Sequence, residues 1–306
     1  MTAPILVSAY PVSPAHAVWD PALEADLLPA ICALPGVAGL EVPWMGSIHP
    51  HDDAWFLAHV PAVSLAVTPI PFVMGRVGAD ARYGLASADD DGRAAALADL
   101  RAVAQGIARI DGESPASVDV VMLHTAPQAG GDVAALARSL DEVAGWGWQG
   151  ARLVIEHCDA FVPGQEYSKG FLPLDDEIAA IEQTGAPIGL WMNWGRSAIE
   201  LRDADAVSAQ IARAAASGRL VGLAFSGAAP VQSVYGPAWI DAHLPIASTY
   251  PESQSLLDEQ HVADALAAAP DVTWLGLKAA RRLDDTTAAD ALATVVRNLD
   301  VIRAAS

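Results

Sequence analysis

The 306-residue sequence is poor in cysteine and in basic residues. Its two cysteines, Cys32 and Cys158, lie far apart without a metal-type spacing, which excludes a disulfide-rich domain and a cysteine zinc site. We expect both thiols to be reduced. Lysine and arginine together number 17 against 37 acidic residues, so the formal net charge is −20. Such a charge repels a polyanion and argues against nucleic acid as a partner, although it also simply keeps a surface soluble.

Long hydrophobic runs are missing too, although 53% of the residues are hydrophobic. No uninterrupted apolar stretch reaches the roughly 18 residues that a membrane-spanning helix needs, so we expect no membrane partner. The first residues lack the basic segment and apolar stretch of a signal peptide and have the pattern of a strand. We therefore expect a cytoplasmic protein.

Short apolar or β-branched runs alternate with alanine-rich segments of helical period along the whole chain. This alternation is typical of repeated strand–helix units and a parallel sheet. The predicted strands are residues 5–9, 39–42, 63–68, 118–124, 153–156, 188–193, 221–225 and 273–278. Eight such strands predict an α/β fold, a single (β/α)8 TIM barrel that forms one domain over residues 1–306.

Helical periodicity predicts helices over residues 20–34, 94–110, 132–144, 174–183, 206–216, 255–268 and 287–303. Three further connections, residues 69–88, 159–173 and 226–254, follow strands and contain Pro, Gly and Tyr. Loops at the C-terminal ends of barrel strands carry the active site, so these three are candidate pocket walls. These connections could also be insertions without a role in the site, or they could form a contact between subunits.

Polar residues end most of the predicted strands, where a barrel holds them on one rim around a common centre. They are Glu41, Thr68, His124, Glu156, Asn193, Ser226 and Lys278. Any one of them alone is as readily a hydrogen-bonded structural group, because buried polar side chains find partners with or without chemistry. Their joint placement favours a small-molecule site.

Glu156, His124 and Lys278 are the candidate catalytic residues of this rim. Glu156 and His124 each follow a buried apolar run, where a carboxyl suits a base and an imidazole suits a proton relay or a ligand. Lys278 follows residues 274–277, and an inward lysine needs an anion nearby. It could bind a substrate anion, pair with Glu156 or act as a Schiff-base amine.

Tryptophans near the same rim suit the apolar faces of sugars. Trp44 follows the second strand and Trp194 the sixth, so both are candidate substrate-binding residues. His157, directly after Glu156, is a further candidate. For Trp191, inside the sixth strand, core packing is at least as good an explanation, because a bulky aromatic side chain buries much area in any barrel.

Two stretches carry a family resemblance: LVIEHCDAFVPGQEYSKGF and LDDEIAAIEQTGAPIGLWMNWGRS. They resemble the middle strands of the xylose-isomerase-like TIM-barrel superfamily, which includes sugar isomerases, hexulose epimerases and a DNA-repair endonuclease branch. The resemblance points to a domain-of-unknown-function branch. The alternation of strand and helix patterns is similar over most of the chain, whereas the similarity in sequence motifs is confined to its central third.

Metal-dependent members of that superfamily share ligands on strands four to eight. His124 and Glu156 match the first two ligands, but Asn193 and Arg196 stand in place of an Asp-x-x-His pair. The strand-seven histidine falls near Ala224, and the strand-eight glutamate falls on Lys278. A divalent ion is repelled by an ammonium and a guanidinium in its own cavity, so we expect no metal and no other cofactor.

The resemblance and the rim residues together predict a sugar isomerase or epimerase. It would act on a small carbohydrate or sugar acid by abstracting a proton next to a carbonyl. Glu156 would be the base, His124 the acid or relay, and Lys278 with Arg196 would stabilise the oxyanion. A catalytically silent carbohydrate-binding barrel, or a lyase or aldolase that uses Lys278, are the alternatives. The sequence leaves the oligomeric state open.

Overall fold

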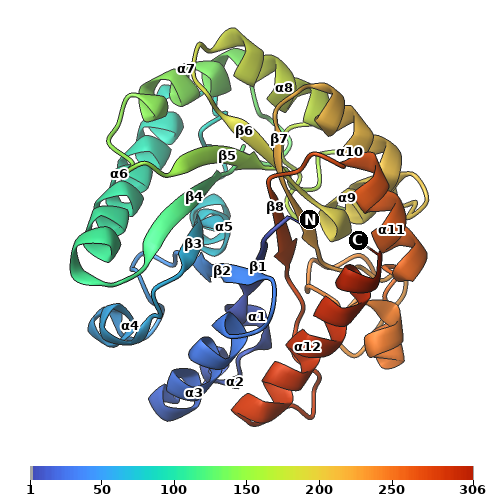
Figure 1. Cartoon of the computed structure of the whole chain (residues 1–306). Coiled ribbons are helices and arrows are strands. Elements are labelled where there is room, and N and C mark those ends of the chain that lie inside the picture. The colour runs from blue at the N-terminus through green and yellow to red at the C-terminus, as the bar shows by residue number, and fades with distance from the viewer. Residues whose placement is uncertain (1–2, 306) are drawn as a thin grey trace.

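The computed structural model describes residues 3–305, so the outermost ends of the predicted 1–306 domain lie outside the described residues. Eight parallel strands close into a barrel in sequence order, which confirms the predicted (β/α)8 fold (Figure 1). The strands are β1 (Ile5–Ser8), β2 (Val37–Pro43), β3 (Ser64–Thr68), β4 (Ser117–Leu123), β5 (Arg152–Glu156), β6 (Gly189–Asn193), β7 (Leu220–Phe225) and β8 (Trp274–Leu277).

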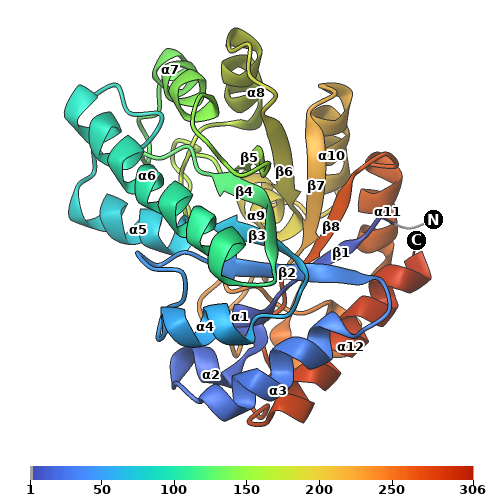
Figure 2. The same ribbon diagram turned by 60° about the vertical axis from the view of Figure 1, so that its left-hand side comes forward.

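Helices form the outer ring around these strands, as Figures 1 and 2 show. They are α1 (Ala9–Val12), α2 (Pro14–Ala17), α3 (Pro21–Cys32), α4 (Asp53–His59), α5 (Ile70–Ala79), α6 (Asp90–Glu113), α7 (Val133–Ala144), α8 (Leu174–Gln183), α9 (Trp194–Leu201), α10 (Val207–Ala216), α11 (Glu259–Ala268) and α12 (Ala288–Ala305). None of the helices within residues 3–305 has both the length and the apolar character to cross a bilayer.

Five helices within residues 3–305, α1, α2, α4, α5 and α9, lie where the sequence pattern predicted no helix, and two of them have an identifiable reason. The first is α5, which takes up half of the predicted 69–88 connection; its Gly75 and Gly78 are weak helix formers and concealed it. A proline in its first turn is tolerated, because the N–H that proline lacks has no partner there. The second is α9, which begins directly after β6 because the Asn193 side chain accepts a hydrogen bond from the Arg196 backbone N–H.

Trp191 fills the barrel interior. Its side chain is fully buried among small and aliphatic residues of the other strands. A Cβ on Gly222 would lie 1.9 Å from the Trp191 ring, and one on Gly276 would lie 3.3 Å from it. Glycines on β7 and β8 therefore make the space for this indole, and Trp191 belongs to the core.

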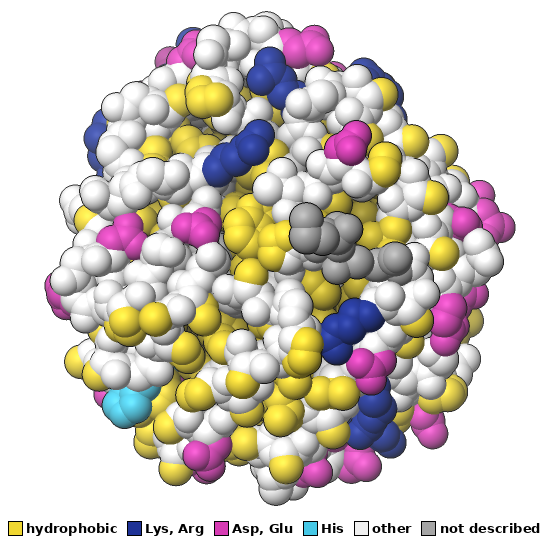
Figure 3. Space-filling view, viewed as in Figure 1, with side chains coloured by type: hydrophobic (Ala, Val, Ile, Leu, Met, Phe, Trp, Pro, Cys, Tyr) yellow, Lys and Arg dark blue, Asp and Glu magenta, His cyan; other side chains and the backbone are white. Residues whose placement is uncertain are grey.

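The exterior mixes apolar and charged groups. On the face viewed in Figure 3, hydrophobic side chains gather around the middle and acidic and basic ones are scattered around them. Ala3, Leu266, Val272 and Leu275 are among the residues that line a hollow beside the start of β8. The charged strand-end residues lie at the opposite, C-terminal end of the barrel.

Gly222→Ala should destabilise the barrel, because the new methyl group overlaps the Trp191 ring. We expect the free energy of unfolding in urea to fall by about 3 kcal/mol. Gly75→Ala is the matched control, since no heavy atom lies within 4 Å of its added Cβ, and it should gain up to about 1 kcal/mol. Equal stability of Gly222→Ala and the wild type would contradict this packing.

Candidate functional site

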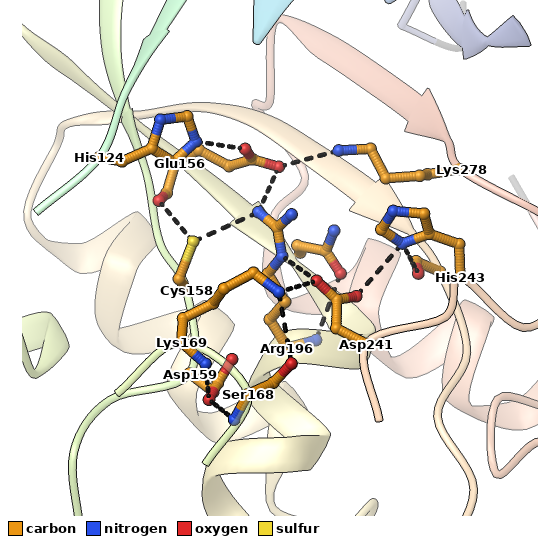
Figure 4. Close-up of polar contacts among 12 residues, drawn as sticks. His124, Glu156, Cys158, Asp159, Ser168, Lys169, Arg196, Asp241, His243 and Lys278 are labelled. Atoms are coloured by element: carbon orange, nitrogen blue, oxygen red, sulfur yellow. Dashed lines mark hydrogen bonds and ion pairs between the residues drawn. The ribbon is translucent and has the colours of Figure 1, made fainter. Parts of the chain in front are cut away.

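Glu156, the last residue of β5, is the centre of a buried polar cluster at the C-terminal mouth of the barrel (Figure 4). Its Oε1 lies 2.7 Å from a terminal guanidinium nitrogen of Arg196 and 3.1 Å from Nζ of Lys278. Its Oε2 lies 2.9 Å from Nε2 of His124 and accepts a hydrogen bond from the Thr68 hydroxyl at 3.3 Å. Side chains from four parts of the barrel thus converge on one carboxylate.

Lys278, directly after β8, joins Glu156 to a second carboxylate. Its Nζ lies 2.6 Å from Oε1 of Glu41, which belongs to β2. The Tyr10 hydroxyl donates to the same Glu41 oxygen at 3.4 Å. Lys278 and Glu41 are both buried, so the ammonium exchanges its water shell for two carboxylates.

Arg196 joins Glu156 to a third carboxylate, Asp241. The Arg196 Nε lies 3.0 Å and the Lys169 Nζ 2.9 Å from Oδ2 of Asp241. The other oxygen, Oδ1, lies 3.2 Å from Nδ1 of His243, and that nitrogen also lies 3.3 Å from the Ser226 hydroxyl. Asp241 and His243 come from the long segment after β7, and Lys169 from the segment after β5.

Three cations balance three carboxylates in this cluster. Burial alone would raise the pKa of Glu156, but Arg196 and Lys278 outweigh it and hold that pKa well below its ordinary value. Burial would lower the pKa of Lys278, but Glu156 and Glu41 raise it above its ordinary value. Both groups are therefore charged at neutral pH, and the cluster carries no surplus charge.

The two histidines of the cluster are neutral. Burial lowers the pKa of His124, and its hydrogen bond with Glu156 does not fully offset that effect. Burial likewise lowers the pKa of His243 in spite of Asp241. Nε2 of His243 has no partner among residues 3–305, and its side chain is 14% exposed. An imidazole with this arrangement can accept a proton at Nε2, and Asp241 then stabilises the imidazolium that forms.

The structure brings together most of the residues that the sequence placed on the rim. Glu41, Thr68, His124, Glu156, Arg196 and Lys278 are in mutual contact, and Ser226 joins through His243. Asn193 lies beside them as the cap of α9, and its Nδ2 is buried without a partner among residues 3–305.

Trp44 and Trp194 are not brought into the cluster. The Trp44 ring packs against Gly106 of α6, and a Cβ added to Gly106 would lie 2.3 Å from that ring. Trp194 is buried with its ring 5.4 Å from that of His261 on α11. Both indoles contribute to packing between the strands and the helical ring.

His157 lies in a separate buried network outside the barrel. Its Nδ1 is 2.8 Å from Glu177 of α8, and its Nε2 is 3.0 Å from Glu200 of α9. Burial would lower its pKa, but the two carboxylates, Glu177 first, raise the pKa of His157 to about 10. Both ring nitrogens are engaged, so His157 ties two helices together.

Tyr10, Lys169, Asp241 and His243 are cluster members that the sequence pattern did not indicate. Lys169 is positioned by Asp159, whose Oδ2 accepts hydrogen bonds from the Ser168 and Lys169 backbone N–H groups at 2.7 and 2.8 Å. The only signal for Asp241 and His243 was the unusual length of the 226–254 connection, which marked the segment but not the residues.

A small pocket adjoins the cluster beside Glu41. We call it the Tyr10–Glu41 pocket; its polar lining consists of Tyr10, His16, Glu24, Glu41 and His49, and Leu28, Ile48 and Phe56 contribute apolar walls. About 350 Å³ of it is free of protein atoms, including the part open to solvent. The pocket therefore offers hydroxyl-binding groups next to Lys278.

The cluster does not fit a divalent ion. Both Glu156 oxygens already have partners, and the Lys278 ammonium lies where the resemblance implies a glutamate ligand in metal-dependent relatives. Within residues 3–305, no group of three or more His, Cys, Asp or Glu side chains could hold a metal ion. An ion at Glu156 would have to displace two cations.

His157→Gln should lower stability most at neutral and acidic pH. The pKa of His157 rises from 6.5 to about 10 on folding, so its charge stabilises the fold fully below about pH 6.5 and ceases to do so as pH passes 10. We expect a loss of about 3 kcal/mol at pH 6.5. In urea titrations, the difference in the free energy of unfolding between the variant and the wild type should become smaller toward pH 10. A difference that stays constant with pH would contradict this role of His157. The exposed His59→Gln is the control.

Comparison with solved structures confirms the xylose-isomerase-like TIM-barrel architecture. The fold is similar to that of an L-ribulose 3-epimerase, with a TM-score of 0.61 at 18% identity, covering 100% of this chain and 96% of that one. It is also similar to D-psicose 3-epimerase from Clostridium cellulolyticum H10, with a TM-score of 0.54 at 14% identity and coverages of 98% and 99%. At such identities the likeness is one of fold.

Sequence comparison reaches nearer relatives. An uncharacterized protein of Salmonella typhimurium is 37% identical over 281 residues, covering 89% of this chain and 88% of that protein. The family model described as Domain of unknown function (DUF4862) matches residues 6–294. The chain therefore belongs to the DUF4862 family.

Proposed function

We propose that this protein is a sugar isomerase or epimerase-like enzyme that transfers a proton next to the carbonyl of a small carbohydrate, without a divalent metal. The observation that carries the proposal is the convergence of Lys278 and Arg196 on Glu156 at the barrel mouth. The structural neighbours that are named as epimerases of ribulose and psicose support the substrate class. A cytoplasmic location remains a prediction.

The two cations would bind the substrate carbonyl. An oxygen placed between Lys278 and Arg196 would replace Oε1 of Glu156 as their acceptor, and the charge that develops on it in an enediolate would be stabilised. Glu41 and Asp241 keep the two cations in place while this exchange occurs. Because the cluster has no surplus positive charge, a neutral sugar suits it better than a sugar acid.

His243 is a stronger candidate base than Glu156, which the sequence pattern predicted as the base. Glu156 has four partners and a depressed pKa, and both weaken a base. His243 is neutral, with a free Nε2 and with Asp241 on its other nitrogen to stabilise the imidazolium. Tyr10, whose ring lies 6.2 Å from that of His243, lines the pocket in which the sugar would sit.

A catalytically silent sugar-binding barrel is the second candidate. This alternative is favoured because Glu156, Lys278 and Arg196 already form ion pairs with one another, and a substrate that binds to the two cations must break some of these pairs. A lysine-dependent lyase or aldolase is disfavoured, because the raised pKa of Lys278 keeps the amine protonated and non-nucleophilic at neutral pH.

Solvent exchange distinguishes the enzyme from the binder. In D2O the protein should introduce deuterium next to the carbonyl of ketoses tested by NMR, and exchange with uronates should be slower. His243→Gln should slow this exchange by about 100-fold or more. His261→Gln is the matched control, because His261 also lies beside an aspartate, 2.7 Å from Asp258, and should retain exchange.

Three outcomes would contradict parts of this assignment. Sugar binding without exchange in the wild type would favour the silent barrel. Loss of exchange in Glu156→Gln but not in His243→Gln would return the role of base to Glu156. A borohydride-trapped adduct on Lys278 would support the lyase.

Metal removal should leave the reaction unchanged, because the cations of the cluster would supply the charge that an ion provides. Exchange rates before and after dialysis against EDTA should agree within about twofold, since a lost Lewis acid would cost several kcal/mol. Elemental analysis of untreated protein serves as the control. One equivalent of tightly bound Mn, Mg or Zn would contradict this prediction.

A further inference from the structure

A second, apolar pocket lies between α5, α6 and the end of β4, which we call the α5–α6 pocket. Its apolar walls are Phe72, Val73, Leu85, Ala96, Leu100 and Val103. About 380 Å³ of it is free of protein atoms, including the part open to solvent. Phe72 and Val73 are partly exposed at its rim, whereas Leu85 and Leu100 are buried.

His124 lines this pocket and has a polar atom without a partner. Its side chain is fully buried, and Nδ1 forms no hydrogen bond among residues 3–305. Figure 4 shows Nε2 directed at Glu156 and Nδ1 directed away from the charged cluster. A buried polar atom without a partner costs about 1–3 kcal/mol, so a group that satisfies it binds with a corresponding gain.

The chemistry of Nδ1 follows from the cluster. The ionised Glu156 carboxylate can only accept a hydrogen bond, so Nε2 of His124, 2.9 Å away, carries the proton. A neutral imidazole has one N–H, which leaves a lone pair on Nδ1. The pocket thus offers one buried, unpartnered hydrogen-bond acceptor within its apolar walls, in addition to the polar groups of Tyr83 and Asp99.

We propose that the α5–α6 pocket is a binding site for a small, flat apolar molecule or ring substituent that carries one O–H or N–H donor, which His124 Nδ1 accepts. A phenolic or indolic group has this chemistry. The ligand would contact the imidazole that holds Glu156, so its binding is linked to the charged cluster. This site is distinct from the Tyr10–Glu41 pocket and does not rest on the proposed function.

The mouth of the pocket has a polar clasp. Arg76 of α5 forms an ion pair with Asp99 of α6 at 2.8 Å, and its guanidinium carbon lies 5.3 Å from the centre of the Tyr83 ring. Tyr83 and Asp99 both line the pocket. Because the ion pair is partly exposed to solvent and therefore weak, a ligand that enters between the two helices can displace it at low cost.

Phenol and toluene are matched probes, because they differ by the hydroxyl donor. Titrations of the full chain, followed by NMR, should give a dissociation constant about fivefold lower for phenol than for toluene. In protein labelled with 15N-histidine, the Nδ1 resonance of His124 should move with phenol and much less with toluene.

Ala96→Met should fill the pocket and weaken phenol binding by about tenfold or more. Ala94→Met places the same side chain on the exposed face of α6 and should bind phenol as the wild type does. Equal affinity for both probes, an unmoved Nδ1 resonance, or phenol binding that survives Ala96→Met would each overturn the assignment. The two-probe comparison on the wild type decides the question even if Ala96→Met fails to fold.

Discussion

The burial of the Glu156 carboxylate is the constraint on which the mouth of this barrel depends. A carboxylate without water needs counter-charges, and Arg196 and Lys278 supply them from α9 and the end of β8. Those cations are buried in turn and need Asp241 and Glu41. Asp241 also pairs with Lys169, so removal of any one member leaves the cluster with an unbalanced buried charge, and six charged groups from distant parts of the chain form one unit.

Much of this unit could be predicted from the sequence, because the geometry of a barrel determines where the residues at the strand ends lie. Glu41, Glu156 and Lys278 each follow an apolar run, and parallel strands bring their C-terminal ends to one rim. The sequence pattern made His157 a candidate for the site, whereas the structure places it outside the barrel. The alternation of side chains at a strand end, which directs neighbouring residues to opposite sides of the sheet, would have indicated this outward position.

The remaining residues had no local signal. Asp241 and His243 lie in a segment without helical or strand periodicity, and only the path of that segment across the mouth brings them to Arg196. Trp44 directly follows β2, the strand that carries Glu41, yet its ring turns outward because Gly106 on α6 leaves room for it. The positions of such side chains depend on packing against residues that are distant in the sequence, and the local sequence pattern does not indicate them.

The neutrality of the buried cluster separates its behaviour from that of the acidic exterior. Dissolved ions screen exposed charges over about 8 Å at physiological ionic strength, but they do not enter a sealed ion-pair network. Added salt therefore weakens the mutual repulsion of a surface with a net charge of −20 while the contacts around Glu156 keep their strength. An uncharged ligand at the mouth of the barrel would therefore meet the same electrostatic environment at low and at high salt concentration.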